Sequence, residues 1–284
     1  MVRQWKLARR SLDYGERTLV MGILNVTPDS FSDGGQFFSL QRAVAHGREM
    51  IEQGADLIDV GGESTRPGAE PVTEAEELSR VLPVIEALSN HLTPPISIDT
   101  TKSLVAKAAL EAGAEIVNDI SGLRFDPLIA DEVAKAKAGL VLMHSRGTPL
   151  TMQRMAPVED IFHEVVQKLR ESVAIAAQRG VASTNMAIDP GIGFGKTVRQ
   201  NLALIANPAR LSRECADLPI VIGTSRKSFI GKLLNNAPAE QRLYGTIGAT
   251  VAAVLNGAHI VRVHDVKATV DALRIVDAIA GNNA

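Results

Sequence analysis

The stretch Ile51-Glu-Gln-Gly-Ala-Asp-Leu-Ile-Asp-Val60 contains a helix end, a glycine and a short apolar strand. The same pattern recurs in Leu110-Glu-Ala-Gly-Ala-Glu-Ile-Val-Asn-Asp119 and in Val254-Leu-Asn-Gly-Ala-His-Ile-Val-Arg-Val263. In each copy the glycine fits the position just after a helix, where a left-handed backbone stops the helix and turns the chain. The polar residues five positions after these glycines should therefore lie at comparable heights in their strands; they are Asp59, Asn118 and Arg262.

Eight short apolar runs occur along the chain, and almost every one ends at a polar, charged or glycine residue. They are Leu19–Leu24, Leu57–Val60, Ile96–Ile98, Ile116–Val117, Leu140–Met143, Met186–Ile188, Ile220–Ile222 and Ile260–Val263. Continuous apolar runs suit strands that are buried on both faces, and their alternation with helical segments implies a parallel sheet. Eight such units predict an α/β fold, a closed (β/α)8 TIM barrel, rather than a doubly wound open sheet. The polar strand ends would then converge on one mouth, where barrel active sites lie.

Length and composition favour one catalytic domain that binds small molecules. A barrel of this type needs about 250 residues, so we expect a single domain over residues 1–284, with the excess in longer loops and a terminal extension. The formal charge of -2 and the pI near 6.3 indicate neither a nucleic-acid partner nor an anionic membrane. The only cysteine, Cys215, excludes an internal disulfide.

The N-terminal segment predicts a small hairpin. Met1–Arg10 is basic but lacks the apolar region of a secretory signal, so we expect a cytoplasmic protein. Trp5, Leu7 and Leu19 flank the polar segment Asp13–Gly15. We interpret this arrangement as a short N-terminal hairpin that plugs the lower end of the barrel.

Two polar loops follow the first two strands. The first loop, Asn25-Val-Thr-Pro-Asp-Ser-Phe-Ser-Asp-Gly-Gly35, begins with an Asn whose oxygen suits a hard cation such as magnesium, although capping of a turn is the simpler role. The second loop is Gly61-Gly-Glu-Ser-Thr-Arg-Pro-Gly68. Its glycines free backbone amides beside Thr65 and Arg66, so an anion site and a solvated loop arginine are equally good interpretations.

A glycine-rich segment follows the strand that ends at Asp189. Gly191-Ile-Gly-Phe-Gly-Lys-Thr197 looks like a phosphate-binding loop, but Pro190 stands where the first glycine belongs, and the dinucleotide-binding spacing is also absent. We reject both motifs. Asp189 itself, if it faces the barrel, suits two parallel hydrogen bonds from an amidine-like edge of a ligand, with Asp99 and Asn118 as further polar groups.

The segment Gly223-Thr-Ser-Arg-Lys-Ser-Phe-Ile-Gly231 opens a helix directly after a strand. Capping by Thr224 or Ser225 would leave free amides for an anionic group such as a carboxylate. Lys227 lies four residues past the strand, so hydrogen bonding and charge are favoured over a Schiff base. No paired-histidine spacing occurs, and a structural zinc is not expected.

Six segments, in order, resemble bacterial dihydropteroate synthases from about Val20 to the C-terminus. They are the first loop, the second loop, Asn118-Asp-Ile-Ser-Gly122, Asp189-Pro-Gly-Ile-Gly-Phe-Gly-Lys196, Ser225-Arg-Lys-Ser-Phe-Ile-Gly231 and Arg262-Val-His-Asp265. The chain departs from the family pattern at Ser145, Arg146 and Gln200, which leaves loop detail open. That family condenses p-aminobenzoate with a dihydropterin carrying a hydroxymethyl diphosphate, and it uses magnesium (Mg2+).

The resemblance implies a role for each candidate residue. It places the pterin ring at Asp99, Asn118, Asp189 and Lys227, the diphosphate at Thr65, Arg66, Arg262 and His264, and p-aminobenzoate at Phe31, Pro67, Lys227 and Ser228. Magnesium would be held by Asn25 and Asp33, and the catalytic residues would be Asp99, Lys227 and Arg262. A homodimer through the helix Gly248–Leu255 and an ordinary sulfonamide-sensitive pocket, given Ser30-Phe31-Ser32 and Pro67, follow in the same way.

The resemblance also favours a dissociative reaction in which pyrophosphate leaves first and the arylamine then attacks a pterin cation. The same barrel and pterin pocket occur in pterin-dependent methyltransferases, but these have no reason for a diphosphate site. A catalytically inactive barrel should have lost one of Asp99, Lys227 or Arg262, and all three are present.

Overall fold

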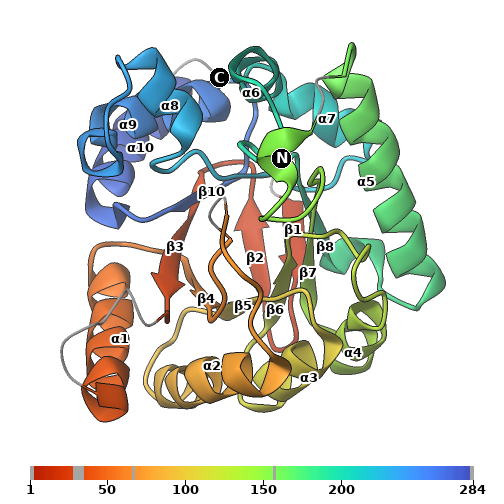
Figure 1. Ribbon diagram of the computed structural model, residues 1–284, viewed down its shortest axis with the longest axis vertical. Coiled ribbons are helices and arrows are strands. Elements are labelled where there is room, and N and C mark those ends of the chain that lie inside the picture. Colours follow the sequence, from red (N-terminus) through yellow and green to blue (C-terminus); the bar gives the residue numbers. More distant parts are fainter. Residues whose placement is uncertain (1–2, 28–34, 66–67, 156–157, 282–284) are drawn as a thin grey trace.

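Eight parallel strands form a nearly closed barrel with the helices around it (Figure 1). The computed structural model describes residues 3–27, 35–65, 68–155 and 158–281. The barrel strands are β3 (Leu19–Asn25), β4 (Leu57–Gly61), β5 (Ile96–Asp99), β6 (Ile116–Asp119), β7 (Gly139–Met143), β8 (Met186–Asp189), β9 (Val221–Ile222) and β10 (Ile260–Val263). Their order is β8-β7-β6-β5-β4-β3-β10-β9, and a parallel bridge between Ile188 and Ile220 joins the two ends. The predicted barrel is confirmed.

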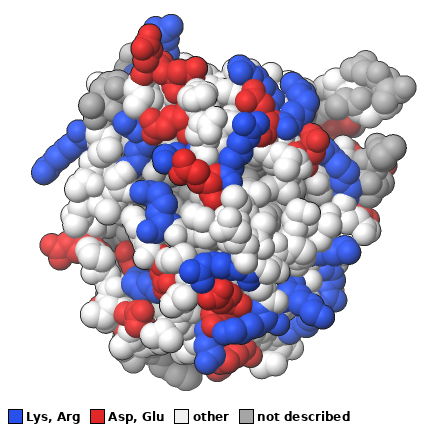
Figure 2. Space-filling view, turned by 90° about the vertical axis from the view of Figure 1, so that its right-hand side faces the viewer, with Lys and Arg blue, Asp and Glu red and all other residues white. Residues whose placement is uncertain are grey.

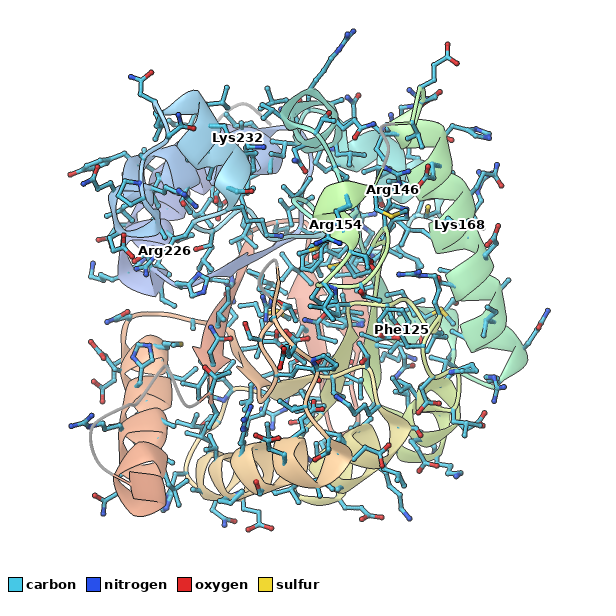
Figure 3. All side chains as sticks on the ribbon, viewed as in Figure 1. Phe125, Arg146, Arg154, Lys168, Arg226 and Lys232 are labelled. Carbon is cyan, nitrogen blue, oxygen red and sulfur yellow. The ribbon has the colours of Figure 1, made fainter. Side chains whose placement is uncertain are left out.

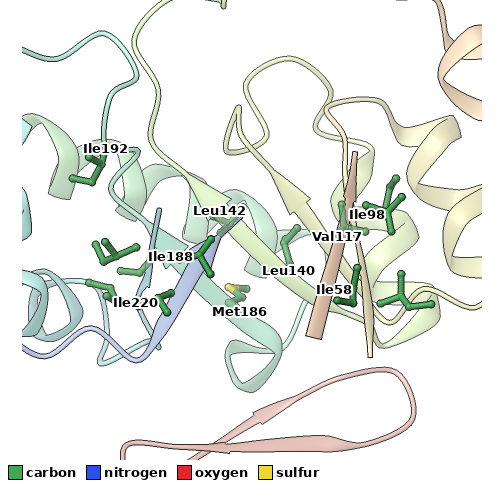
Figure 4. Packing of buried hydrophobic residues seen from close by; sticks show 14 of the residues in the cluster. Ile58, Ile98, Val117, Leu140, Leu142, Met186, Ile188, Ile192 and Ile220 are labelled. Carbon is green, nitrogen blue, oxygen red and sulfur yellow. The ribbon is translucent and has the colours of Figure 1, made fainter. Parts of the chain in front are cut away.

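Side chains alternate along each strand between the helix layer and the barrel interior. Ile58, Ile98, Val117, Leu140, Leu142, Met186, Ile188 and Ile220 belong to the large core between strands and helices (Figure 4). In β4, Ile58 faces the helices, whereas Leu57, Asp59 and Gly61 lie on the opposite face of the strand, toward the barrel interior. The inward set therefore becomes polar toward the carboxyl end of the strands, where the predicted mouth lies.

Ten helices of the described chain surround the strands. They are α1 (Gly35–Glu52), α2 (Glu74–Ser89), α3 (Ser103–Glu111), α4 (Ile129–Ala136), α5 (Ile161–Gln178), α6 (Val198–Ile205), α7 (Pro208–Glu214), α8 (Ser228–Leu233), α9 (Leu243–Leu255) and α10 (Val266–Gly281). The glycines of the internal repeat have left-handed φ angles: 101° at Gly54, 116° at Gly113 and 97° at Gly257. Their predicted function as helix stops is confirmed, because a side chain there would strain the backbone.

The N-terminal hairpin pairs β1 (Arg3–Lys6) with β2 (Ser11–Tyr14) in antiparallel fashion. Trp5 is completely buried in a cluster with inward residues of the barrel strands, including Leu57, Ile116 and Ile260. The hairpin thus seals the end of the barrel opposite the mouth, as predicted. The turn lies between Lys6 and Ser11, however, so Tyr14 belongs to the second strand.

The surface of the described chain shows charges of both signs. On the face that carries α5, Lys and Arg side chains are interspersed with Asp and Glu (Figure 2). Within the described residues, none of the helices combines the length and the apolar character needed to cross a membrane.

Candidate active site

A row of four residues crosses the mouth at the carboxyl ends of adjacent strands. Asn25 pairs in register with Gly61, Gly61 with Asp99, and Asp99 with Asn118. Because the strands are in this register, the side chains of the row project into the barrel at one level. A Cβ at position 61 would be in van der Waals contact with its neighbours, 3.5 Å from Asp99 Cβ and 3.8 Å from both Asn25 Oδ1 and Asp99 Oδ2, so the glycine brings these oxygens close to the backbone of β4.

Arg262 of β10 reaches across the mouth to two carboxylates. Its Nε donates to Asp59 Oδ2 at 2.6 Å, and its Nη2 donates to Asp99 Oδ2 at 2.7 Å. Asn118 Nδ2 donates to the same oxygen of Asp59 at 2.9 Å. The internal repeat had placed Asp59, Asn118 and Arg262 at comparable heights, and they do meet. Sequence reasoning nevertheless did not name Asp59 as a site residue.

Burial controls the ionisation of this cluster. It raises the pKa of Asp99 to about 7, although the Arg262 guanidinium opposes the shift. Burial also opposes the charge of Arg262, but Asp59 and Asp99 outweigh it and raise the pKa of Arg262. Asp59 is completely buried, and its Oδ1 has no hydrogen-bond partner in the described chain. The mouth thus holds a permanent cation between two carboxyl groups, and Asp99 changes charge near neutral pH.

Asp189 is the last residue of β8, and Lys227 lies in the segment between β9 and α8. Asp189 Oδ1 accepts a hydrogen bond from the Gly191 amide at 2.6 Å. Lys227 Nζ donates to the Ile192 carbonyl and lies 4.7 Å from the centre of the Phe194 ring. Burial raises the pKa of Asp189 and lowers the pKa of Lys227 to about 8, while the two opposite charges moderate each other's shift.

The glycine-rich segment after β8 surrounds a cation. Lys196 Nζ lies 2.8 Å from the carbonyl oxygen of Gly191, 3.1 Å from that of Phe194 and 3.4 Å from that of His144. A phosphate-binding loop directs backbone amides at an anion, whereas this loop directs carbonyls at an ammonium group. The rejection of the phosphate-binding motif is therefore supported by the structure, and Lys196 holds the loop that carries Phe194.

The start of α8 differs from the sequence prediction. The N-cap residue is Lys227, without a side-chain capping bond, and the helix begins at Ser228. Ser225 instead accepts from the His264 amide at 3.2 Å and lies 2.9 Å from His264 Nδ1. Thr224 pairs with the Thr250 hydroxyl at 2.9 Å. The predicted cap by Thr224 or Ser225 is wrong, because both hydroxyls have partners in other elements.

Three further side chains complete the description of the mouth and its loops. Ser228 is exposed at the first turn of α8, and Thr65 is partly buried at the base of the second loop. Arg226, labelled in Figure 3, makes a two-bond ion pair with Asp265 rather than facing the strand-end row. The predicted residues Phe31, Asp33, Arg66 and Pro67 lie outside the described residues.

The oxygen groups beside Gly61 fit a hard cation. Asn25 places an amide oxygen beside Gly61, and Asp99 Oδ2, which also accepts from Arg262, lies near the same position. Magnesium prefers oxygen ligands and keeps several of its own waters or phosphate oxygens, so few protein ligands suffice. Within the described residues, no group of three or more His, Cys, Asp or Glu side chains is arranged to hold a metal ion. The amide and carboxylate oxygens beside Gly61 are of the type that magnesium prefers.

Comparison with known proteins assigns this mouth to a family. The family described as pterin binding enzyme matches residues 21–264. A dihydropteroate synthase from Synechocystis sp. is 48% identical over 267 residues, which cover 94% of this chain and 92% of that protein. The chain belongs to the dihydropteroate synthase family.

Solved structures of that family share the whole architecture. The dihydropteroate synthase of Xanthomonas albilineans with 4-aminobenzoic acid has a TM-score of 0.91 and 43% identity, covering 99% of each chain. The Burkholderia cenocepacia enzyme in complex with 7,8-dihydropteroate has a TM-score of 0.88 and 41% identity, covering 100% of this chain and 99% of that one. The family match includes all the candidate residues from Asn25 to His264.

Proposed function

We propose that this chain transfers a pterinylmethyl group from a dihydropterin hydroxymethyl diphosphate to p-aminobenzoate, giving dihydropteroate and pyrophosphate. The observation that carries this proposal is the meeting of Arg262, Asp99 and Asn118 in one mouth, with Lys227 and Asp189 beside them. The membership of the dihydropteroate synthase family supports the same reaction.

The pterin ring is assigned to the buried polar groups. Asp189 presents a carboxylate to the amidine-like edge of the ring, which suits two parallel hydrogen bonds. Asn118 and Asp99 offer further donors and acceptors, and Lys227 donates from the opposite side through the two N–H bonds that its carbonyl partner leaves over. The Phe194 ring, already beside Lys227, gives an apolar surface against which a flat ligand can stack.

The diphosphate is assigned to the positive side of the mouth. Arg262 and His264 lie two residues apart at the end of β10 and project to the same side, and Thr65 with Arg66 would approach from the second loop. The carboxylate of p-aminobenzoate would lie at Ser228, where no side chain of the N-cap residue caps α8, with Phe31, Pro67 and Lys227 about its ring.

Magnesium is proposed at Asn25, with Asp33 as its second protein ligand. When bound there, the ion neutralises negative charge that develops on the diphosphate oxygens. The protein side of this step belongs to Arg262, which is positively charged throughout the working pH range and already lies in the mouth.

We propose a dissociative reaction. The carbon–oxygen bond breaks with its electron pair going to pyrophosphate, and the carbon–nitrogen bond to the arylamine forms with loss of one amine proton. Arg262 stabilises the departing charge, and the ionised Asp99 stabilises the positive charge on the pterin. Because water competes for the same cation, closing the mouth over the substrates favours the amine.

The test is pyrophosphate release by the purified chain with magnesium, measured with and without p-aminobenzoate. We expect multiple turnovers only when both substrates are present, and a fall of about a hundredfold or more in the variant Arg262→Met. Transfer of a methyl group to a cobalamin protein with no pyrophosphate release would contradict the proposal. So would the absence of any reaction while the pterin still binds.

The order of events has its own test. A crystal of the chain soaked with magnesium and the pterin diphosphate, without p-aminobenzoate, should contain bound pyrophosphate or a pterin cation. Intact substrate in every such crystal would contradict the dissociative order. Competition between a sulfonamide and p-aminobenzoate in the steady state tests the assignment of the p-aminobenzoate site in the same way.

Two further proposals concern the setting of the enzyme. We propose a homodimer in the cytoplasm, formed through the α9 segment Gly248–Leu255. Large exposed apolar side chains on α8, α9 and α10 support the dimer: Leu233, Leu234, Tyr244, Leu255, Ile275 and Ile279. Light scattering of the purified chain tests it, and a monomer at all concentrations would contradict it.

A further inference from the structure

Three charged side chains form a cluster beneath the second loop, outside the residues assigned to substrate. Lys102 Nζ donates to the carboxylate of Glu63 and to Glu77 Oε2, the latter at 2.6 Å. Glu63 follows β4 by two residues, Glu77 belongs to α2, and Lys102 is the N-cap residue of α3. A single ammonium group thus connects the loop to two helices.

The buried carboxylate of Glu77, on α2, fixes the position of this ammonium group. The side chain of Glu77 is completely buried, and its Oε1 has no hydrogen-bond partner in the described chain. Burial raises the pKa of Glu77, and Lys102 opposes that shift by its hydrogen bond and its charge. A buried carboxylate that loses its cation destabilises the fold, so the ion pair with Glu77 fixes the position of the Lys102 ammonium group. The partly exposed Glu63 is therefore the adaptable member of the cluster.

The base of the second loop is packed on the same helix. A Cβ on Gly62 would lie 2.7 Å from Val81 Cγ1, so only a glycine allows the loop to approach α2 this closely. Arg80 Nη1 donates to the Gly62 carbonyl at 2.6 Å. On the far side of the loop, the Gly68 amide donates to the Pro149 carbonyl at 3.1 Å. Glu63 directly follows this packed base and lies two residues before Thr65.

The cluster also adjoins the strand-end row. The Lys102 amide donates to Thr100 Oγ1 at 3.3 Å, and the Thr100 amide donates to the Asn118 carbonyl at 3.1 Å. Thr100 directly follows Asp99. Lys102 is therefore connected through the backbone to the residues assigned to the pterin and through its side chain to the second loop.

We propose that Lys102 is a positioning residue: by binding Glu63 it holds residues 62–65 and so places Thr65 for the diphosphate. This inference rests on the proposed function for the identity of the substrate. Two parts of the substrate then depend on different residues. The pterin ring binds the strand-end row, whereas binding of the diphosphate depends on the hydrogen bond between Glu63 and Lys102.

The decisive variant is Glu63→Gln, because it weakens the loop connection and leaves the buried Lys102–Glu77 pair intact. One charge-assisted hydrogen bond is worth enough for a rise of about tenfold in KM for the pterin diphosphate, with kcat little changed. The affinity for the hydroxymethyl dihydropterin without its diphosphate should stay at the wild-type value. Hydrogen exchange at the amides of residues 62–65 should become faster.

Two variants at Lys102 complete the series. Lys102→Arg keeps a cation between the two carboxylates and should restore near wild-type KM, whereas Lys102→Met should raise KM at least as much as Glu63→Gln. The matched control is Glu111→Gln, which removes the exposed partner of Lys107 on the same helix and should change neither KM nor exchange.

Three results would overturn the inference. One is a wild-type KM in Glu63→Gln, and another is an equal loss of affinity for the pterin with and without diphosphate, which would indicate general damage. The third is unchanged hydrogen exchange at residues 62–65. Hydrogen exchange needs no substrate, so it tests this inference even when the wild-type chain releases no pyrophosphate. That absence of pyrophosphate release would refute the proposed function alone.

Discussion

Two lysines beside the barrel mouth are surrounded in different ways. Lys196, in the loop after β8, has three backbone carbonyls within 3.4 Å of its Nζ. Lys227, at the start of α8, donates to one carbonyl and otherwise faces an aromatic ring and the carboxylate of Asp189. Burial lowers the pKa of both side chains. Both lysines therefore carry a charge that burial disfavours. They differ in their hydrogen-bond donors, because backbone carbonyls surround Lys196, whereas Lys227 has one carbonyl partner among the described contacts.

The difference separates a structural cation from a functional one. An ammonium group has three N–H donors, and the protein itself occupies those of Lys196. Lys227 keeps donors for a ligand, and an incompletely paired buried charge is the kind of group that active sites retain. Motif searching had picked out Lys196, in a segment that looks like a phosphate-binding loop, so counting partners distinguishes the two lysines better than the motif does.

The largest expected effect is on catalysis at Lys227. The variant Lys227→Met should lower kcat/KM by about a hundredfold to a thousandfold, because one donor to the substrate is lost, while thermal stability stays near wild type. Steady-state kinetics and thermal unfolding check this. The control is Lys267→Met, which removes an exposed lysine paired with Asp271. A fall in stability that matched the loss of activity would erase the distinction between the two lysines.

The second effect is on stability at Lys196. Lys196→Met removes the cation that binds three backbone carbonyls, of which only Gly191's is shown to accept a second hydrogen bond, from the Phe194 amide. The free energy of unfolding should therefore fall by about 3 kcal/mol. Denaturant unfolding measures it, with Lys168→Met on the exposed side of α5 as the control. A variant as stable as the wild type but inactive would show that Lys196, too, acts on the substrate.

The pH dependence of kcat/KM sharpens the comparison next. Asp99 is ionised above its pKa of about 7, and Lys227 is protonated below its pKa of about 8. Activity that needs both charged forms should fall as the pH drops through the first value and as it rises through the second. Lys227→Arg should move the alkaline limb to higher pH, since a guanidinium stays protonated there. An alkaline limb that stays in place in this variant would assign it to another group.

The smallest effect concerns the glycine that faces Lys227. Gly193 has φ of +87°, and a Cβ there would lie 3.0 Å from Lys227 Cδ. Gly193→Ala should cost about 1 kcal/mol of stability and lower kcat/KM severalfold by displacing the lysine. Gly180→Ala, with φ of +93° at the end of α5, carries similar strain far from the mouth and should leave kcat/KM unchanged. An equal kcat/KM in both variants would show that Gly193 does not contribute to the position of Lys227.

The sequence could predict the barrel because its signals are local. Each apolar run such as Leu57–Val60 specifies its own strand, and the polar residue that ends it specifies the mouth. The repeat even placed Asp59, Asn118 and Arg262 at one level. For the first and second loops the sequence alone left alternatives open at Asn25 and at Thr65 with Arg66. Family resemblance favoured the ligand roles and added Asp33, and these roles remain proposals.

Long-range partners are what the sequence could not show. Ser225 looked like a helix cap, but His264, far along the chain, takes its hydroxyl, so the helix begins later. The three carbonyls around Lys196 come from two loops, and no spacing rule brings His144 to Gly191. The hairpin was predicted, yet its turn was misplaced because Tyr14 packs on His259 of the barrel.

The hairpin at the base of the barrel has a consequence for the order of folding. Trp5 donates from Nε1 to the carbonyl of Asn185 at 2.8 Å and packs among residues that extend to Ile260. This hairpin therefore finds its place only after the strands far downstream have formed, and contacts of such sequence separation are slow to form. Because the chain has a single tryptophan, the fluorescence of Trp5 during refolding should report the final closure of the ring, separately from the earlier appearance of helices in circular dichroism.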